Sequence, residues 1–116
     1  MQRSFRLRRN ADFVRVRAEG RVWRHPFLML SAVANGLDHN RYGFVTSKQL
    51  GGAVIRNRVR RLMREAVRLS APQIASGYDI VLIARNESVG QSYKDIKATL
   101  EQLFKRAKVW QEVSKS

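Results

Sequence analysis

The chain has 116 residues, no cysteine and a formal net charge of +14, which results from 23 Lys and Arg against 9 Asp and Glu. Its length and its 44% hydrophobic content predict one packed domain over residues 1–116, with no room for a second. The lack of cysteine excludes a disulfide scaffold, a thiol nucleophile and Cys-ligated metal sites, and the charge points to an anionic partner, above all nucleic acid.

The sequence shows no membrane or secretion signal. Its longest apolar runs, 27–30 and 80–84, are too short to cross a bilayer. Arginines at the N-terminus are not followed by the apolar segment of a secretory signal. We therefore expect a soluble, cytoplasmic protein without a membrane partner.

The predicted elements alternate between helical spacing and short apolar runs. In chain order they are a capped helix from Asn10 to Gly20, strands at 21–23, 27–33 and 41–47, a helix at 53–69, a strand at 78–84 and a helix at 93–107. The strand at 78–84 is almost continuously apolar, so we expect it to be central and buried on both faces. The polar tail at 111–116 should fray. This order predicts an α+β domain, with one sheet packed by helices.

The helix at 53–69 has the strongest functional signal. At about 100° per residue, one arc of about 140° is basic or amide-bearing and comprises Arg56, Asn57, Arg60, Arg61, Arg64 and Arg68. The opposite arc is apolar and comprises Ile55, Val59, Leu62, Met63, Ala66 and Leu69. Val67 is the exception, because it falls on the basic side. Arginines four residues apart repel one another, and a merely solvated face would mix in acids. We interpret the basic arc as a surface for nucleic-acid phosphates.

The type of nucleic acid follows from what precedes this helix. A helix-turn-helix needs another helix just upstream, whereas residues 41–47 are strand-like. No heptads support a basic zipper. RNA binding by a mixed sheet-and-helix domain fits better.

At this point the motifs resemble a known family. The segment YGFVTSKQLGGAV at 42–54, followed by RNRVRRLMREA at 56–66, is similar to the signature of the protein subunit of bacterial ribonuclease P. Residues 7–10, Asp12, Phe13 and Gly20 resemble the opening of that family. The segments 78–85 and 100–104 resemble its later strand and last helix, so the similarity covers nearly the whole chain.

The resemblance implies both architecture and function. It implies the order helix, three strands, helix, strand, helix, in which the Arg-rich helix crosses over between two parallel strands. It also implies a chain that partners a catalytic RNA subunit and the 5′ leader of precursor tRNA, and so assists endonucleolytic removal of the leader. The chemistry is then expected in the RNA, with Mg²⁺ held mainly by the RNA subunit and the substrate. No obligate protein partner is expected.

The resemblance also assigns site residues by position. The residues implied to bind the RNA subunit are Arg56, Asn57, Arg58, Arg60, Arg61, Arg64 and Arg68. Those implied to bind the leader are Phe13, Arg17, Ser47 and Lys48. Arg17 stands where the family often has an aromatic side chain, although a guanidinium can also stack on a base. No catalytic or metal-ligating residue is predicted in this chain.

Two other functions remain open at the level of sequence. One is a ribosomal-type RNA-binding or assembly protein without a catalytic role. The other is a metal-dependent nuclease, which would need converging carboxylates, whereas the acids here are isolated along the chain. The two histidines, His25 and His39, lie in predicted loops and are interpreted as surface residues. For Phe13, a place in the core and a role in stacking have similar weight.

Overall fold

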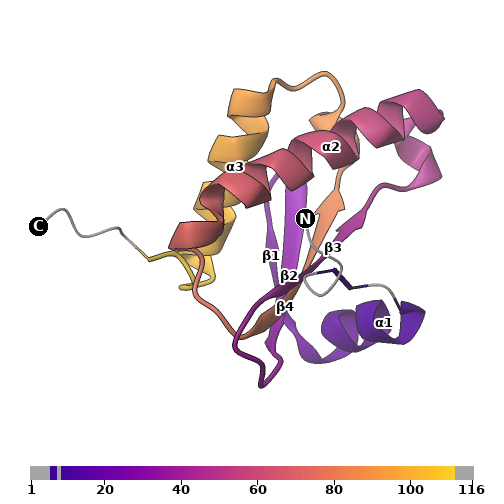
Figure 1. Cartoon of the computed structure of the whole chain (residues 1–116). Coiled ribbons are helices and arrows are strands. Elements are labelled where there is room, and N and C mark those ends of the chain that lie inside the picture. Colours follow the sequence, from indigo (N-terminus) through magenta and orange to yellow (C-terminus); the bar gives the residue numbers. More distant parts are fainter. Residues whose placement is uncertain (1–5, 8, 112–116) are drawn as a thin grey trace, which may run out of the picture.

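A computed structural model describes residues 6, 7 and 9–111 of the chain (Figure 1). Its regular elements are α1 (Asn10–Glu19), β1 (Arg21–Arg24), β2 (Leu28–Ala34), β3 (Arg41–Val45), α2 (Ala53–Ser70), β4 (Tyr78–Ala84) and α3 (Tyr93–Arg106). Three short 3-10 turns join them: η2 (Lys48–Leu50), η3 (Ala71–Gln73) and η4 (Asn86–Ser88). The predicted α+β class and the order of elements are confirmed.

The four strands form one sheet in the order β1-β2-β4-β3. The pairs β1–β2 and β2–β4 are antiparallel, whereas β3 and β4 are parallel, in a register that runs from Arg41↔Asp79 to Val45↔Ile83. The Arg-rich helix α2 is thus the crossover between two neighbouring parallel strands, as expected. β4 lies inside the sheet, and most of its residues are buried, which confirms its predicted central place.

The helices divide between the two faces of the sheet (Figure 1). α2 and α3 cover one face over the larger apolar core, in which Phe104, Leu28, Leu30 and Met63 are among the fully buried side chains. α1 covers the other face, over a smaller cluster of Leu7, Val16 and Val81.

Some details differ from the sequence prediction. The N-cap of α1 is Arg9, and no side chain caps the helix, so the predicted cap is wrong. β3 ends at Val45, two residues early, because the chain turns into η2 after Ser47. Of the predicted tail only Gln111 is described, and its N–H donates to the Gln73 carbonyl; the predicted fraying of 112–116 lies outside the described residues.

The buried face of α2 is rotated from the predicted one. Its buried residues are Val59, Met63, Ala66, Val67 and Ser70. Val67, assigned to the basic side, is fully buried, whereas Ile55 and Leu69 of the predicted apolar arc are 39% and 50% exposed. This rotation brings one flank of the arginine surface down beside β3. None of the described helices is both long and apolar enough to span a membrane.

Candidate nucleic-acid interface

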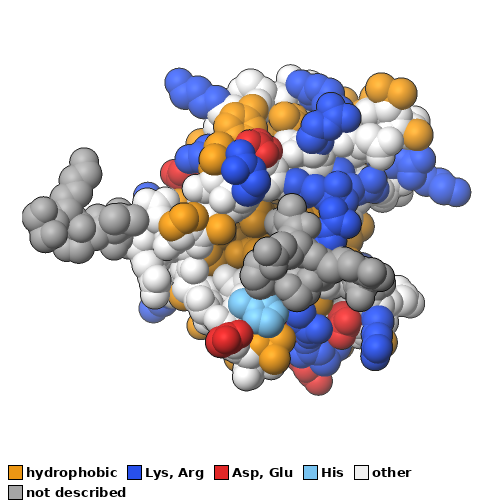
Figure 2. Space-filling model, viewed as in Figure 1, with side chains coloured by type: hydrophobic (Ala, Val, Ile, Leu, Met, Phe, Trp, Pro, Cys, Tyr) orange, Lys and Arg blue, Asp and Glu red, His pale blue; other side chains and the backbone are white. Residues whose placement is uncertain are grey.

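The arginines of α2 form two rows on either side of its exposed face. The inner row, Arg56, Arg60 and Arg64, is spaced by four residues along the flank that borders the buried face. Arg56 and Arg60 are half-buried there. The outer row, Arg58, Arg61 and Arg68, is exposed, as is Asn57. Figure 2 shows basic side chains gathered over this helix.

Two arginines of the inner row, Arg60 and Arg64, contact β3 or the residue that follows it. Arg60 Nη2 donates to Thr46 Oγ1 over 2.6 Å, and its Nη1 donates to Asn57 Oδ1 over 3.0 Å. The Arg64 guanidinium lies 6.0 Å from the centre of the Phe44 ring, a cation–π contact. Two of the arginines predicted for RNA binding therefore lie at the outer edge of the sheet rather than in the middle of a solvated helix face.

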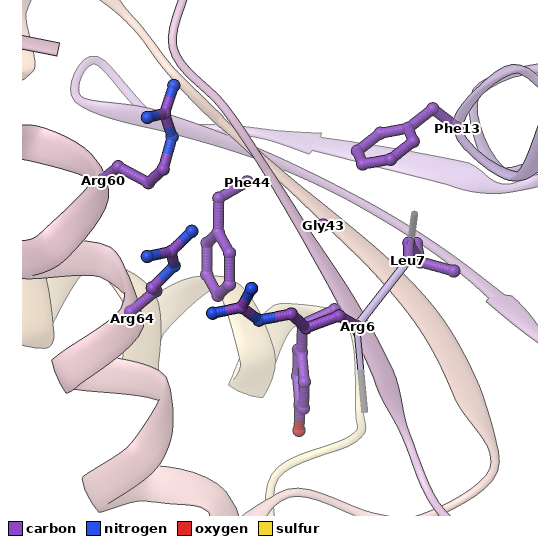
Figure 3. Close-up of a pocket in the computed structure, with 8 residues that line it drawn as sticks. Arg6, Leu7, Phe13, Gly43, Phe44, Arg60 and Arg64 are labelled. Atoms are coloured by element: carbon purple, nitrogen blue, oxygen red, sulfur yellow. The ribbon is translucent and has the colours of Figure 1, made fainter. Parts of the chain in front are cut away.

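A cavity of about 160 Å³ opens at this edge (Figure 3). Its basic lining comes from Arg60 and Arg64 on α2 and from Arg6 on the N-terminal segment. Tyr42, Gly43 and Phe44 of β3 contribute the strand side, and Leu7 and Phe13 the remainder. In Figure 3 the guanidinium groups of Arg6 and Arg64 extend toward each other beside Phe44, with Arg60 above them. A basic, partly aromatic cavity of this kind suits a phosphate with an attached base.

The charges around the cavity are not neutralised by acids. Burial, and then the nearby charges of Arg6 and Arg60, lower the pKa of Arg64 from its ordinary value. Of the six arginines in α2, only Arg68 has an ion pair among the described residues, with Glu65. The remaining five have no carboxylate partner in that part of the chain. Uncompensated cations at this density are a basis for binding a polyanion.

Phe13, a predicted leader-binding residue, lies on the other side of β3. Its ring packs directly on Gly43, where a β-carbon would come within 2.4 Å of Phe13 Cε1. Phe13 is half-buried against the smaller cluster, so it is both a packing residue and part of the cavity lining. Arg17, one helical turn later on α1, is exposed.

The other two predicted leader-binding residues follow β3. Ser47 and Lys48 are exposed at its carboxyl end. Ser47 lines a second cavity of about 320 Å³, together with Gln49 and residues 83–87. Phe13 and Ser47 thus line different cavities, while Arg17 and Lys48 line neither of these two.

Sequence reasoning missed several residues of this surface. Arg6 lies outside the motif, and nothing local in the sequence places it beside α2. Phe44 could have been predicted, because side chains alternate along β3 and this places Tyr42 and Phe44 on the face opposite Gly43 and Val45. Thr46 follows the same alternation.

Among the described residues, no three His, Cys, Asp or Glu side chains gather into a group that could hold a metal ion. The fully buried carboxylate of Asp79 is paired with Arg15 and Arg41 instead.

The chain is similar to known proteins over almost its whole length. The family model described as Ribonuclease P matches residues 1–108. A ribonuclease P protein component from Roseiflexus castenholzii is 46% identical over 112 residues, which cover 96% of this chain and 92% of that protein. Among solved structures, the Staphylococcus aureus RNase P protein superposes with a TM-score of 0.85 at 34% identity, covering 91% of this chain and 97% of that one. The RNase P protein from Thermotoga maritima superposes with a TM-score of 0.81 at 30% identity, covering 87% of this chain and 96% of that one.

The family match and the near-complete coverage of relatives agree with the architecture described above. The chain belongs to the family of ribonuclease P protein components.

Proposed function

We propose that this chain binds the catalytic RNA subunit of ribonuclease P and the 5′ leader of precursor tRNA, and that it assists Mg²⁺-dependent removal of the leader. The observation that carries the proposal is the arginine surface of α2, where five of six guanidinium groups have no carboxylate partner among the described residues. Family membership favours a catalytic RNA as the polyanion that this surface faces.

The two rows of α2 suit contact with folded RNA. The exposed outer row reaches phosphates on a neighbouring strand, and Arg60 and Arg64 of the inner row line a cavity that can take a phosphate group. On the opposite face of the sheet, the Phe13 ring and Arg17 offer a surface on which leader bases can stack. We assign catalytic Mg²⁺ to the RNA subunit and the substrate, and to this chain the neutralisation of phosphate charge between them.

Reconstitution tests the proposal. Precursor tRNA is incubated in Mg²⁺ with a ribonuclease P RNA alone, with the chain alone, and with both. We expect the chain alone to be inactive, and the pair to cleave at the mature 5′ end faster than the RNA does, most clearly at low Mg²⁺.

Two results would contradict it. RNA cleavage by a preparation of the chain that is free of contaminating nucleases would favour a nuclease in its own right. No effect on the RNA, together with co-purification of ribosomal RNA, would favour a ribosomal-type assembly protein.

A further inference from the structure

Asp79 lies at a junction of four elements. Its carboxylate is fully buried at the start of β4, on the face covered by α1. Oδ1 accepts hydrogen bonds from Asn35 Nδ2 at 3.0 Å and from Arg41 Nε at 2.8 Å. Oδ2 accepts from Arg41 Nη2 at 2.7 Å and from Nη2 of Arg15 on α1. Both oxygens are therefore fully used, and the donors come from β3, the turn after β2 and α1.

The buried carboxylate of Asp79 is contacted by two arginines, one more than its charge requires. Arg41 is the register partner of Asp79 on the neighbouring strand and holds it with two parallel bonds, the strongest geometry for this pair. Burial would raise the pKa of Asp79, but the hydrogen bonds of Arg41 and Asn35 and the charges of Arg41 and Arg15 hold it below its ordinary value. Arg41 alone balances the charge of the carboxylate, so the second contact, from Arg15, serves a further purpose. Arg15 Nη1 also lies 3.8 Å from Glu19 Oε2 on the same helix.

The place of Arg15 on α1 indicates that purpose. At about 100° per residue, Phe13 and Arg15 are separated by about 160° around the side of the helix that faces the sheet. Val16, which is fully buried, lies between them on that side. The helix is thus held at its two flanks: Phe13 rests on Gly43, and Arg15 is tied to Asp79.

We infer that Arg15 is a positioning residue, which through Asp79 fixes the rotation of α1 about its own axis and so the placement of Phe13 and Arg17 for the leader. Without this tie, α1 keeps its apolar contact through Val16 but can roll about it. The inference rests on the proposed leader-binding role, and one of its tests does not depend on that role.

The test compares Arg15→Met with Lys94→Met. Both remove one positive charge, but Lys94 is an exposed residue on α3, on the other face of the sheet. The first readout is the NMR shift of the Gly43 α-protons, one of which points at the Phe13 ring and so reports its position. The second is the affinity of the reconstituted holoenzyme for precursor tRNA with a long leader, relative to mature tRNA. The third is the affinity for the RNA subunit.

We expect Arg15→Met to move the Gly43 resonances and to reduce discrimination in favour of the leader about five- to tenfold, the lower part of the range for stacking of one base. RNA-subunit affinity should stay within about twofold, because α1 and α2 lie on opposite faces of the sheet. Arg15→Lys, which can still donate to Asp79, should restore part of both effects. Lys94→Met should change neither.

Unmoved Gly43 resonances in Arg15→Met would overturn the inference, even if the RNA experiments agreed with the proposed function. Moved resonances with unchanged leader discrimination would also overturn it, because α1 would then have rolled without consequence for the substrate. If Arg15→Met does not fold, Arg15→Lys is measured instead. Shifted Gly43 resonances together with wild-type leader discrimination in Arg15→Lys would refute the positioning role of Arg15. Loss of RNA-subunit binding by the wild-type chain would instead refute the proposed function.

Discussion

Replacing Gly43 by alanine gives the sharpest test of how α1 lies on the sheet. The new β-carbon would lie 2.4 Å from Cε1 and 2.7 Å from Cζ of Phe13, so the ring must move away from β3. Overpacking of this kind costs ~1–3 kcal/mol. Gly43 is not among the glycines with a positive φ, so alanine suits the backbone and returns ~0.4–1 kcal/mol by restricting the unfolded chain. We expect Gly43→Ala to lose up to about 2.6 kcal/mol of unfolding free energy, the difference between these two contributions.

The same substitution in a Phe13→Ala background separates this contact from other effects. Phe13 is only half-buried, so its own removal should cost less than the ~3–5 kcal/mol of a fully buried phenylalanine. With the ring absent, a β-carbon at position 43 meets no phenyl atoms. Gly43→Ala should then be neutral or slightly stabilising, which gives a coupling energy of about 1–3 kcal/mol between the two positions.

Urea unfolding of the wild type, the two single variants and the double variant measures this coupling. The affinity of the reconstituted enzyme for the leader is measured in parallel. Phe13→Ala and Gly43→Ala should both weaken binding of a precursor with a long leader, by ~1–3 kcal/mol if one base stacks on the ring, and leave mature tRNA unaffected. An equal cost of Gly43→Ala in both backgrounds would refute the packing of Phe13 on β3. An unstable Phe13→Ala variant with unaltered leader discrimination would refute the leader assignment.

Three further predictions concern charge. Replacing Arg60 and Arg64 together by alanine should lower RNA-subunit affinity and reduce the slope of log affinity against log salt by up to about two. Loss of the hydrogen bond from Arg60 to Thr46 should also cost about 0.5–1.5 kcal/mol of stability, measured by urea unfolding. Millimolar sulfate or phosphate should raise the melting temperature by several degrees more than chloride does at equal ionic strength, because ions that bind only the folded arginine cluster stabilise it by mass action. The folded-state pKa of Asp79 is lowered, so its contribution is complete above the ordinary aspartate value of about 3.9 and is lost as the pH falls through the lower folded value. The difference in unfolding free energy between wild type and Asp79→Asn should therefore be constant near neutral pH and shrink in acid.

Each of these has a control and a contradicting result. Arg58→Ala with Arg61→Ala removes two exposed outer-row charges that have no side-chain hydrogen bond or ion pair among the described residues, so it should reduce the salt slope without the loss of stability. Equal stabilisation by chloride and sulfate would mean general screening and no anion site. A difference between wild type and Asp79→Asn that grows on acidification would show that the carboxylate is not stabilised in its charged form.

The helices and strands could be predicted from local periodicity, because the spacing of apolar residues within each element indicates its type. The continuous apolar run at 78–84 and the helical spacing at 53–69 needed no knowledge of distant residues. Which side of α2 is buried was harder to predict, because two apolar stripes overlap in its sequence. The steps from Val59 to Met63 and Val67 mark the buried stripe, whereas Ile55 and Leu69 near the helix ends share its apolar character without its burial.

The details of the candidate site depend on contacts between residues far apart in the chain. Arg15 and Asp79 are 64 residues apart, and Arg41 and Asp79 are 38 apart, so no sequence window contains either pair. The same holds for Arg6 beside Arg64. The motif singled out the arginines of α2, but only the fold shows that two of them share a cavity with an N-terminal residue.

The position of β3 also bears on how the chain behaves at high concentration. β3 is an edge strand, and the one bridge on its outer side among the described residues joins Arg6 to Tyr42. Exposed strand edges promote pairing between copies and aggregation, and positive side chains along an edge oppose it. Arg6, Arg60 and Arg64 lie along this one. Two copies that approached edge to edge would bring six cations together, so the side chains proposed to face RNA would also oppose pairing through this edge of the sheet.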